Sequence, residues 1–200
     1  MNSPILPIDF FKNNNTISLS KKLLGKSLFT NISNNVTGGI IVETEAYCGI
    51  NDKASHAYNN KKTERTKTMF KGGGVCYVYL CYGIHFLFNI VTGKENIPNA
   101  VLIRAIEPIK GINFMLDRRN LEKKCYNITN GPGKLSQALG IHGGFNEMPI
   151  QNDTIWIENN KIKIDKKNIL SSARIGVDYA KEDAHLPYRF YLKNNKWVSK

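Results

Sequence analysis

Cysteine is scarce in this chain, and its spacing argues against a structural zinc site. The sequence contains four cysteines (Cys48, Cys76, Cys81 and Cys125), and no two of them form a Cys-x-x-Cys pair. Cys76 and Cys81 lie within apolar, strand-like runs, where a free cysteine usually packs as a small hydrophobic side chain. We therefore expect a reduced intracellular protein without structural zinc.

Long apolar runs are absent as well. No segment has the roughly 18 uncharged apolar residues that a membrane helix needs, and residues 1–8 lack the basic start and apolar core of a secretory signal. The sequence has no internal repeat and no Pro- or Ser-rich linker. We therefore expect a single domain over residues 1–200, with the N-terminal segment 1–15 packed on its body.

Acidic residues are few compared with basic ones. The chain has 28 Lys and Arg against 16 Asp and Glu, which gives a net charge of +12. Such an excess indicates a polyanionic partner, either nucleic acid or an anionic membrane, although a merely soluble basic surface would give the same count. A membrane surface is the weaker alternative, because the chain lacks a basic amphipathic helix.

The sequence also lacks the spacing of a Walker motif, which argues against nucleotide hydrolysis. The stretch Gly131-Pro132-Gly133-Lys134 instead resembles a turn that opens a short helix. The backbone N–H groups at such a start, together with Lys134, would suit a phosphate.

Strand-like runs dominate the middle of the chain. Residues 39–47 are rich in β-branched residues, and residues 75–91 read as a hairpin with Tyr82-Gly83 at its tip. Between them, residues 48–74 are too polar and Gly-rich for much regular structure, and a loop this long is usually functional. Other expected elements are helices near 16–24 and 111–121, a short helix within 131–140, a buried strand at 99–106, and short strands at 155–157, 162–164 and 188–192.

Several residues that can do chemistry lie on these strands. Glu43, Glu45 and Tyr47 share one face of the first strand, although a strand glutamate is more often a surface ion-pair partner. Arg104 interrupts a buried run, which is uncommon unless it pairs with a carboxylate or a phosphate. Tyr77 and Tyr79 share a face of the hairpin.

Taken together, these stretches resemble the alkyladenine (3-methyladenine) DNA glycosylase family. The resemblance covers roughly residues 16–199, and the order and spacing of the blocks carry it. The main matching blocks are Val42-Glu43-Thr44-Glu45-Ala46-Tyr47, Ala54-Ser55-His56, Tyr77-Val78-Tyr79, Tyr82-Gly83, Asn89-Ile90, residues 101–108, residues 131–135, Arg174-Ile175-Gly176-Val177, Arg189-Phe190-Tyr191 and Trp197-Val198.

The resemblance implies an α+β fold, in which helices surround a curved antiparallel sheet with a protruding hairpin. It also implies a monofunctional, monomeric enzyme that needs no cofactor and no metal. Such an enzyme would hydrolyse the N-glycosidic bond of alkylated, and also deaminated or etheno, purines flipped out of double-stranded DNA, without cutting the strand. It would act at the nucleoid in the cytoplasm of a prokaryote, or in the nucleus of a eukaryote.

Residue roles follow from the same resemblance. Glu45 matches the general base that activates water, and Arg104 matches an arginine beside that water. Tyr47, His56 and Tyr79 match residues that sandwich the base, and Asn89 matches the residue that clashes with the amine of guanine. Tyr82 matches the side chain that fills the gap in the duplex. Four basic residues are expected to contact the DNA backbone: Lys61, Arg65, Lys67 and Lys134.

The cation–π effect is consistent with these roles, but the residues alone leave alternatives for His56, for Glu45 and for the function itself. Tyrosine faces favour a cationic alkylated purine over a neutral base by the cation–π effect. On the residues alone, His56 can equally be a core histidine, and Glu43 rivals Glu45 as the base. A non-catalytic module that binds nucleic acid and reads a modified base would use the same basic surface and aromatic pocket, but would gain little from a carboxylate near phosphates.

Overall fold

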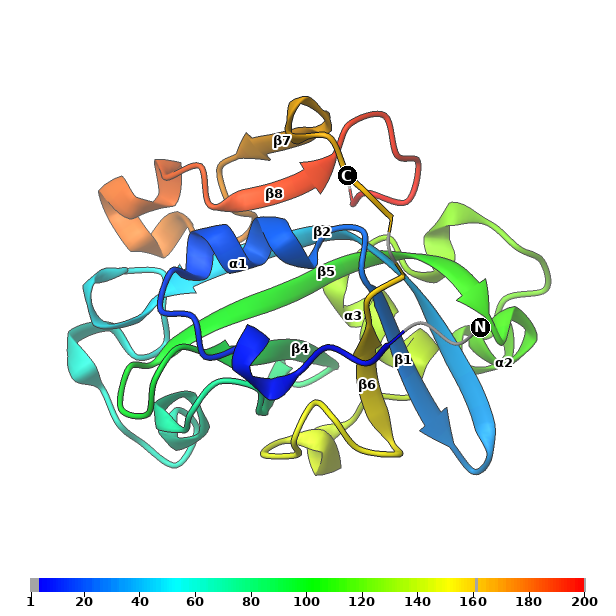
Figure 1. The fold of residues 1–200 in the computed structure, drawn as a ribbon, viewed down its shortest axis with the longest axis horizontal. Helices are drawn as coiled ribbons and strands as arrows, with labels where there is room; N and C mark the ends of the chain where they lie inside the picture. The colour runs from blue at the N-terminus through cyan, green and yellow to red at the C-terminus, as the bar shows by residue number, and fades with distance from the viewer. Residues whose placement is uncertain (1–3, 161, 200) are drawn as a thin grey trace.

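Strand β2 (Asn35–Cys48) is the central element of the fold (Figure 1). The computed structural model describes residues 4–160 and 162–199. Its strands pair antiparallel in the order β3-β4-β5-β2-β1-β6, and β8 joins both β2 and β7. The other strands are β1 (Ser27–Ile32), β3 (Cys76–Cys81), β4 (His85–Thr92), β5 (Asn99–Lys110), β6 (Ile155–Glu158), β7 (Ile169–Ser172) and β8 (Arg189–Leu192).

The pairing of β2 with β5 contains a bulge that positions a charged side chain. Glu43 lies opposite Ala105, but the next residue, Thr44, lies opposite Ile103. Arg104 therefore has no partner residue in the ladder at this point. Bulges re-aim side chains, and here the irregularity brings the Arg104 guanidinium to the carboxylate of Glu43.

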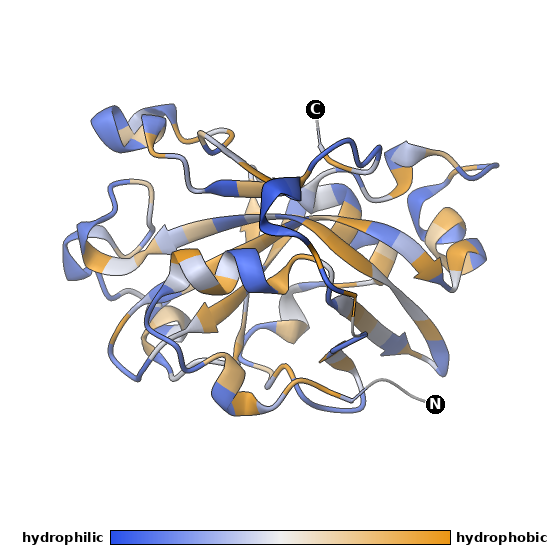
Figure 2. Cartoon of the chain, turned by 45° about the horizontal axis from the view of Figure 1, so that its top comes forward, coloured by the Kyte–Doolittle hydropathy of each residue, from blue (hydrophilic) through white to orange (hydrophobic). Residues whose placement is uncertain are grey.

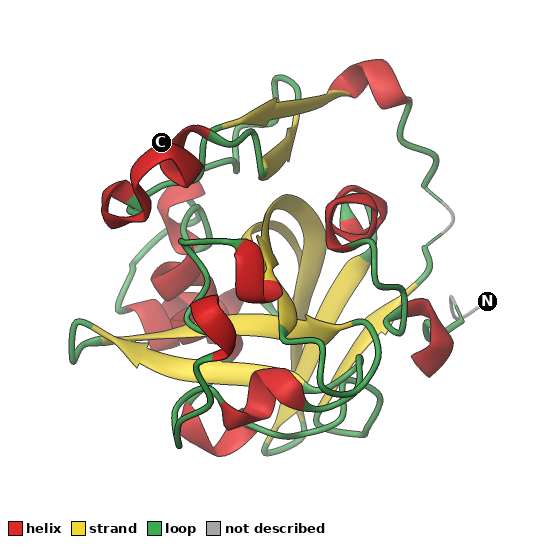
Figure 3. Ribbon diagram, turned by 90° about the vertical axis from the view of Figure 1, so that its left-hand side faces the viewer, coloured by secondary structure: helices red, strands yellow, loops and turns green. Residues whose placement is uncertain are grey.

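The hairpin β3–β4 projects from the body on the side away from α1 (Figure 3). Its arms pair from Cys76 opposite Ile90 to Cys81 opposite His85. The turn between them contains Tyr82 and Gly83, both with positive φ. The predicted hairpin is confirmed, with its tip where the sequence placed it.

Helices cover both faces of the sheet. Helix α1 (Thr16–Leu23) begins after Asn15, whose side chain accepts a hydrogen bond of 2.8 Å from the Ser18 N–H, and it buries Leu19 and Leu23. On the other face, α3 (Pro132–Leu139) packs against β4 and β5, with α2 (Ile112–Arg119) beside it. The 3-10 turns are Ile8–Phe10, Gly49–Asn51, Tyr58–Asn60, Lys67–Phe70, Tyr126–Ile128, Gly143–Phe145, Lys166–Asn168 and η8 (Asp178–His185).

The apolar residues concentrate on the strands, whereas the loops and outer helix surfaces are mostly hydrophilic (Figure 2). The strand order, the hairpin pairing and the helix packing confirm the predicted α+β fold with a curved antiparallel sheet and a protruding hairpin. The segment 48–74 is irregular apart from three 3-10 turns, as expected. Residues 4–15 run along the body, where the Leu6 N–H donates to the Ile157 carbonyl and Phe11 is buried; residues 1–3 lie outside the described part.

The strand expected at 162–164 was wrong. Ile162 and Ile164 belong to an extended connection without a strand partner, and the Ile164 side chain packs over Gly25. The strand in this region is β7, which pairs with β8 and was not predicted. Its sequence, Ile-Leu-Ser-Ser, carries too little apolar alternation to show a strand.

Candidate active site

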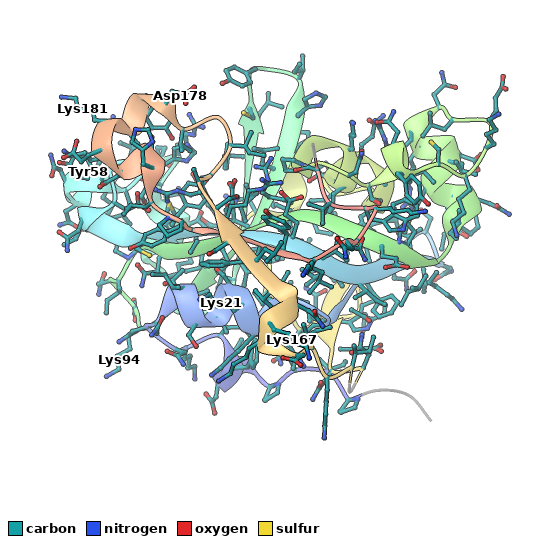
Figure 4. The ribbon with its side chains drawn as sticks, turned by 90° about the horizontal axis from the view of Figure 1, so that it is seen from above. Lys21, Tyr58, Lys94, Lys167, Asp178 and Lys181 are labelled. Carbon is teal, nitrogen blue, oxygen red and sulfur yellow. The ribbon has the colours of Figure 1, made fainter. Side chains whose placement is uncertain are left out.

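A cavity of about 880 Å³ opens between the sheet and the loops around it. Strands β2 to β5 supply one wall. The loop before β3, the hairpin tip at Tyr82 and the turn at the start of α3 add further lining residues. So do residues 175–177, Tyr179 and Ser199. Figure 4 shows the loop that bears Tyr58 beside η8, which bears Asp178 and Lys181. An ion pair between Lys53 and Glu182 ties this loop to η8.

The structure brings most of the predicted site residues to this cavity. Glu45 and Lys67 are the exceptions. Glu45 lies directly behind the wall, in contact with three residues that line the cavity: Tyr47, Arg104 and Ile175. The predicted residues in the wall itself are Tyr47, His56, Lys61, Arg65, Tyr79, Tyr82, Asn89, Arg104 and Lys134.

The carboxylate of Glu45 is fully buried and has one unused acceptor position. Its Oε1 accepts a hydrogen bond of 2.9 Å from the Ile175 N–H and lies 3.3 Å from Arg104 Nη1. Its Oε2 accepts a bond of 2.9 Å from the Tyr47 hydroxyl. A carboxylate offers about four lone-pair positions. Three donors therefore leave one position on Oε2 open to a water molecule.

Glu43 differs from Glu45 because two guanidinium groups and both donors of Ser199 reach it. Its Oε1 lies 3.1 Å from Arg104 Nε, 2.6 Å from Arg189 Nε and 2.8 Å from Ser199 Oγ. Its Oε2 accepts a bond of 2.7 Å from the Ser199 N–H. Three of these four donors gather on Oε1, and two of the four are guanidinium groups, whereas Glu45 contacts a single guanidinium. The two carboxylates that the sequence could not separate thus have distinct environments.

Arg104 joins the two carboxylates. Burial alone would lower the pKa of Arg104, but the Glu45 and Glu43 carboxylates outweigh it and raise the pKa, so the guanidinium stays charged. One cation therefore serves two buried anions, and Arg189 supplies a second positive charge at Glu43.

Tyr47 is held between its hydroxyl partner and a cation behind its ring. Burial and the adjacent Glu45 carboxylate raise the pKa of Tyr47 well above its ordinary value, so the phenol keeps its proton and donates to Glu45. The Arg174 guanidinium lies 4.9 Å from the ring centroid. Arg174 is itself fixed by both oxygens of Asp52, at 2.5 and 2.8 Å, and by the Ala46 carbonyl.

Another part of the cavity wall is a cluster of aromatic rings. The centroid of His56 lies 4.7 Å from that of Tyr79 in an edge arrangement, and the Tyr77 and Tyr79 rings are 5.4 Å apart. His56 Nδ1 lies 2.9 Å from the Tyr77 hydroxyl. The structure thus adds Tyr77 to the predicted pair, and the only sequence signal for it was its shared face with Tyr79.

Asn89 and Tyr82 mark the floor and the rim of the cavity. Asn89 is buried, and its amide N–H₂ donates to the carbonyls of Tyr77 and Leu87 at 3.2 and 3.4 Å. Tyr82 at the hairpin tip is 89% exposed, and its neighbour Ile84 is 71% exposed. Two large side chains therefore stand in solvent at a tip that no protein segment covers.

The four predicted backbone contacts have different environments. Lys134 Nζ lies 2.5 Å from Asn127 Oδ1 and 3.1 Å from Asn130 Oδ1, beside the start of α3. Lys61 is an exposed residue of the cavity rim, whereas Lys67 pairs with Glu64 at 2.6 Å. Arg65 does not simply extend into solvent, because its guanidinium lies 4.8 Å from the centre of the Tyr79 ring.

Sequence reasoning missed four residues that hold the buried charged groups of the site in place. Asp52, Ile175, Arg189 and Ser199 all bond to Glu43, Glu45 or Arg174. Arg174, Ile175 and Arg189 fell inside blocks that carried the family resemblance, but nothing in their local pattern indicated a role.

Within 4–160 and 162–199, no three or more His, Cys, Asp or Glu side chains gather in a way that could hold a metal ion. No helix in these ranges is long and apolar enough to cross a bilayer.

Comparison with known proteins gives the family. The family model described as methylpurine-DNA glycosylase matches residues 9–196. The chain is 48% identical to a Chlamydia felis protein over 96% of its own length and 98% of the relative's. It is 45% identical to a Clostridium novyi protein (95% and 96% covered) and 42% identical to one from Natranaerobius thermophilus (97% and 98%).

Each of these three relatives is named "Putative 3-methyladenine DNA glycosylase". The agreement spans nearly the whole of each sequence, including the strands and loops that build the cavity. The chain therefore belongs to the methylpurine-DNA glycosylase family, and its role is that of a DNA glycosylase in DNA repair.

Proposed function

We propose that this enzyme hydrolyses the N-glycosidic bond of alkylated purines that have been rotated out of duplex DNA, with Glu45 as the general base. The observation that carries the proposal is the open acceptor position on Glu45 Oε2, immediately behind a cavity walled by aromatic rings. Glu43 is held instead by two guanidinium groups and by both donors of Ser199, and we give it a supporting role.

The protruding hairpin supports the first step, which is base flipping. Extruding a base costs a few kcal/mol, and damaged or mismatched bases cost least. Tyr82, in solvent at the tip, enters the duplex and fills the space that the base leaves. Its ring stacks on the neighbouring bases and offsets part of that cost.

The flipped purine then enters the cavity between Tyr47 on one side and His56 with Tyr79 on the other. Stacking on aromatic side chains is worth about 1–3 kcal/mol per base. A 3-methylated adenine is cationic while it is attached to the sugar, and the tyrosine faces attract that charge. Asn89 on the floor limits which substituents a purine can carry there.

Bond cleavage needs water at Glu45, which is buried in the free enzyme. We place its entry beside Tyr47, the cavity-lining residue that contacts Glu45 Oε2, where the acceptor position is open. The carboxylate takes a proton from the water as its oxygen attacks the anomeric carbon, and it stabilises the positive charge that develops on the sugar. Arg104 holds the carboxylate in place.

Strand cleavage is not part of this mechanism, since water rather than a lysine amine attacks the sugar. The enzyme of this proposal acts as a monomer on double-stranded DNA. The relatives are bacterial, so we place the enzyme at the nucleoid.

The test is Glu45→Gln, assayed for release of free 3-methyladenine from alkylated duplex DNA and for binding to the same DNA. Positioned proton transfer contributes about 10²–10⁴-fold, so release should fall at least 100-fold while binding survives. The matched control is Glu107→Gln, a β5 carboxylate that accepts a hydrogen bond from Asn195 away from the site. Undiminished release by Glu45→Gln would remove Glu45 from its role.

A further inference from the structure

Arg65 lies against the aromatic wall of the cavity rather than away from it. Its guanidinium carbon is 4.8 Å from the Tyr79 ring centroid, and its Nη2 is 3.4 Å from His56 Nε2. Both contacts lie at the cavity, which Arg65 itself lines. A permanent cation with up to five donor hydrogens is thus present where a purine would stack.

The contact with Arg65 defines the protonation of His56. A guanidinium can only donate, so His56 Nε2 must be the acceptor and Nδ1 carries the proton toward the Tyr77 hydroxyl. Burial, and then the Arg65 charge, lower the pKa of His56 to about 4. His56 is therefore neutral at physiological pH and cannot serve as the acid for a departing base.

A neutral purine needs help from the ring side of the cavity. Deaminated and etheno purines carry no positive charge, so the purine takes the electron pair of the broken C1′–N9 bond and leaves as an anion. Tyr77 and Tyr79 keep their protons, because burial raises the pKa of both phenols. They are neutral donors, which leaves Arg65 as the cation at these rings.

We propose that Arg65 is a specificity-determining residue that donates hydrogen bonds to an acceptor atom of a neutral purine and stabilises the negative charge of the departing base. No proton leaves the guanidinium: the attacking water gives its proton to Glu45, and the released purine anion takes one from solvent. This inference rests on the proposed function and adds to it a residue that distinguishes one class of purine from another.

The same placement predicts the opposite effect on cationic lesions. A guanidinium on the Tyr79 face occupies a cation–π position that a methylated purine would use, and like charges repel. Arg65 should therefore favour neutral over cationic bases. A residue that held only a phosphate would affect both classes of base equally.

The experiment compares Arg65→Met and Arg65→Lys with the wild-type chain in single-turnover excision from duplexes carrying hypoxanthine (neutral) or 7-methylguanine (cationic). Arg65 is exposed, so the variants should fold. We expect Arg65→Met to lower the hypoxanthine rate at least tenfold relative to the 7-methylguanine rate, with Arg65→Lys in between. Lys61→Met, at the rim of the same cavity, is the matched control and should change both rates by one factor.

Three outcomes would overturn the inference. Equal loss on both bases together with weaker duplex binding would make Arg65 a backbone contact. Unchanged rates on both would give it no role in excision. A wild-type enzyme that releases 7-methylguanine but not hypoxanthine or ethenoadenine would show that the enzyme excises no neutral base, and Arg65 could then not favour one. If the wild-type chain releases none of these bases or 3-methyladenine, the proposed function itself fails.

Discussion

Ser199 closes the set of donors around Glu43: its N–H donates to Oε2 at 2.7 Å and its hydroxyl to Oε1 at 2.8 Å. The two residues are 156 positions apart in the chain. Glu43 also binds Arg104, and Arg104 in turn contacts Glu45. Ser199 therefore helps to position the proposed general base through these two residues. The buried charges form one connected network rather than separate pairs.

Glu43→Gln should destabilise the fold and reduce excision. The amide N–H₂ would face donors already aimed at the carboxylate and leave buried guanidinium groups unpaired. Breaking one partner of a buried ion pair costs about 3–5 kcal/mol, which urea unfolding would measure. The Glu107→Gln control removes a single partly buried acceptor and should lose about 0.5–1.5 kcal/mol. Equal losses in the two variants would contradict the network.

Arg174→Met should destabilise the fold by a similar amount, about 3–5 kcal/mol, because it leaves Asp52 buried without its cation. It also removes the guanidinium behind Tyr47, so KM for alkylated DNA should rise even at temperatures where the variant is folded. Combining Arg174→Met with Asp52→Asn tests the pairing. The loss in the double variant should be smaller than the sum of the two single losses, and an additive result would deny the coupling.

His56 gives the stability a defined pH dependence. Its pKa of about 4 in the folded chain lies below the unfolded value near 6.5. Between these values the unfolded chain binds a proton that the folded chain does not. Stability should therefore fall as the pH drops from about 6.5 to 4, by up to about 3 kcal/mol from this residue, with no contribution above that window.

Urea unfolding of the wild type and of His56→Gln at pH 7 and pH 4.5 isolates this contribution, because carboxylate effects are common to both proteins. The loss of stability on acidification should be smaller in His56→Gln. Parallel losses would mean that His56 titrates normally in the folded chain.

Much of the fold and several site residues were predictable because their signals are local. The hairpin shows as two apolar runs around Tyr82-Gly83, and α1 shows as helical spacing after the Asn15 cap. By contrast, Glu43 and Glu45 share a face and a residue type, and what separates them is the donors that reach each carboxylate. Those donors are Ser199 and Arg189 on one and Ile175 on the other, all supplied from distant parts of the chain.

Arg65 illustrates the same limit. A lysine- and arginine-rich loop predicts a phosphate contact, and nothing in the local sequence indicates that one of its side chains folds back onto Tyr79. The bulge at Glu43 is also hidden in the sequence, since it depends on the register that β5 adopts beside β2. The position of the Arg65 side chain and the bulge at Glu43 both depend on contacts between segments that are distant in the sequence.

Tyr82→Ala should weaken binding to duplex DNA that carries an abasic site without affecting stability. The side chain is 89% exposed, so its loss should change the free energy of unfolding by less than about 0.5 kcal/mol. The lost stacking corresponds to about 1–3 kcal/mol of binding free energy. Ile84→Ala, at the same tip, is the control and should have a smaller effect. Unchanged affinity in Tyr82→Ala would show that Tyr82 stays outside the duplex.

Lys134→Ala should reduce the salt dependence of DNA binding. Asn127 and Asn130 hold the Lys134 ammonium at the edge of the cavity without neutralising it, so it can meet a phosphate beside the flipped nucleotide. Each neutralised phosphate contributes about 0.9 to the slope of log K against log salt, and the slope should fall by about that amount. Lys21→Ala is the control, because Lys21 lies on α1, on the side of the sheet away from the hairpin (Figure 4). If the two variants shift the slope equally, the charge of the chain attracts DNA as a whole and Lys134 makes no discrete contact.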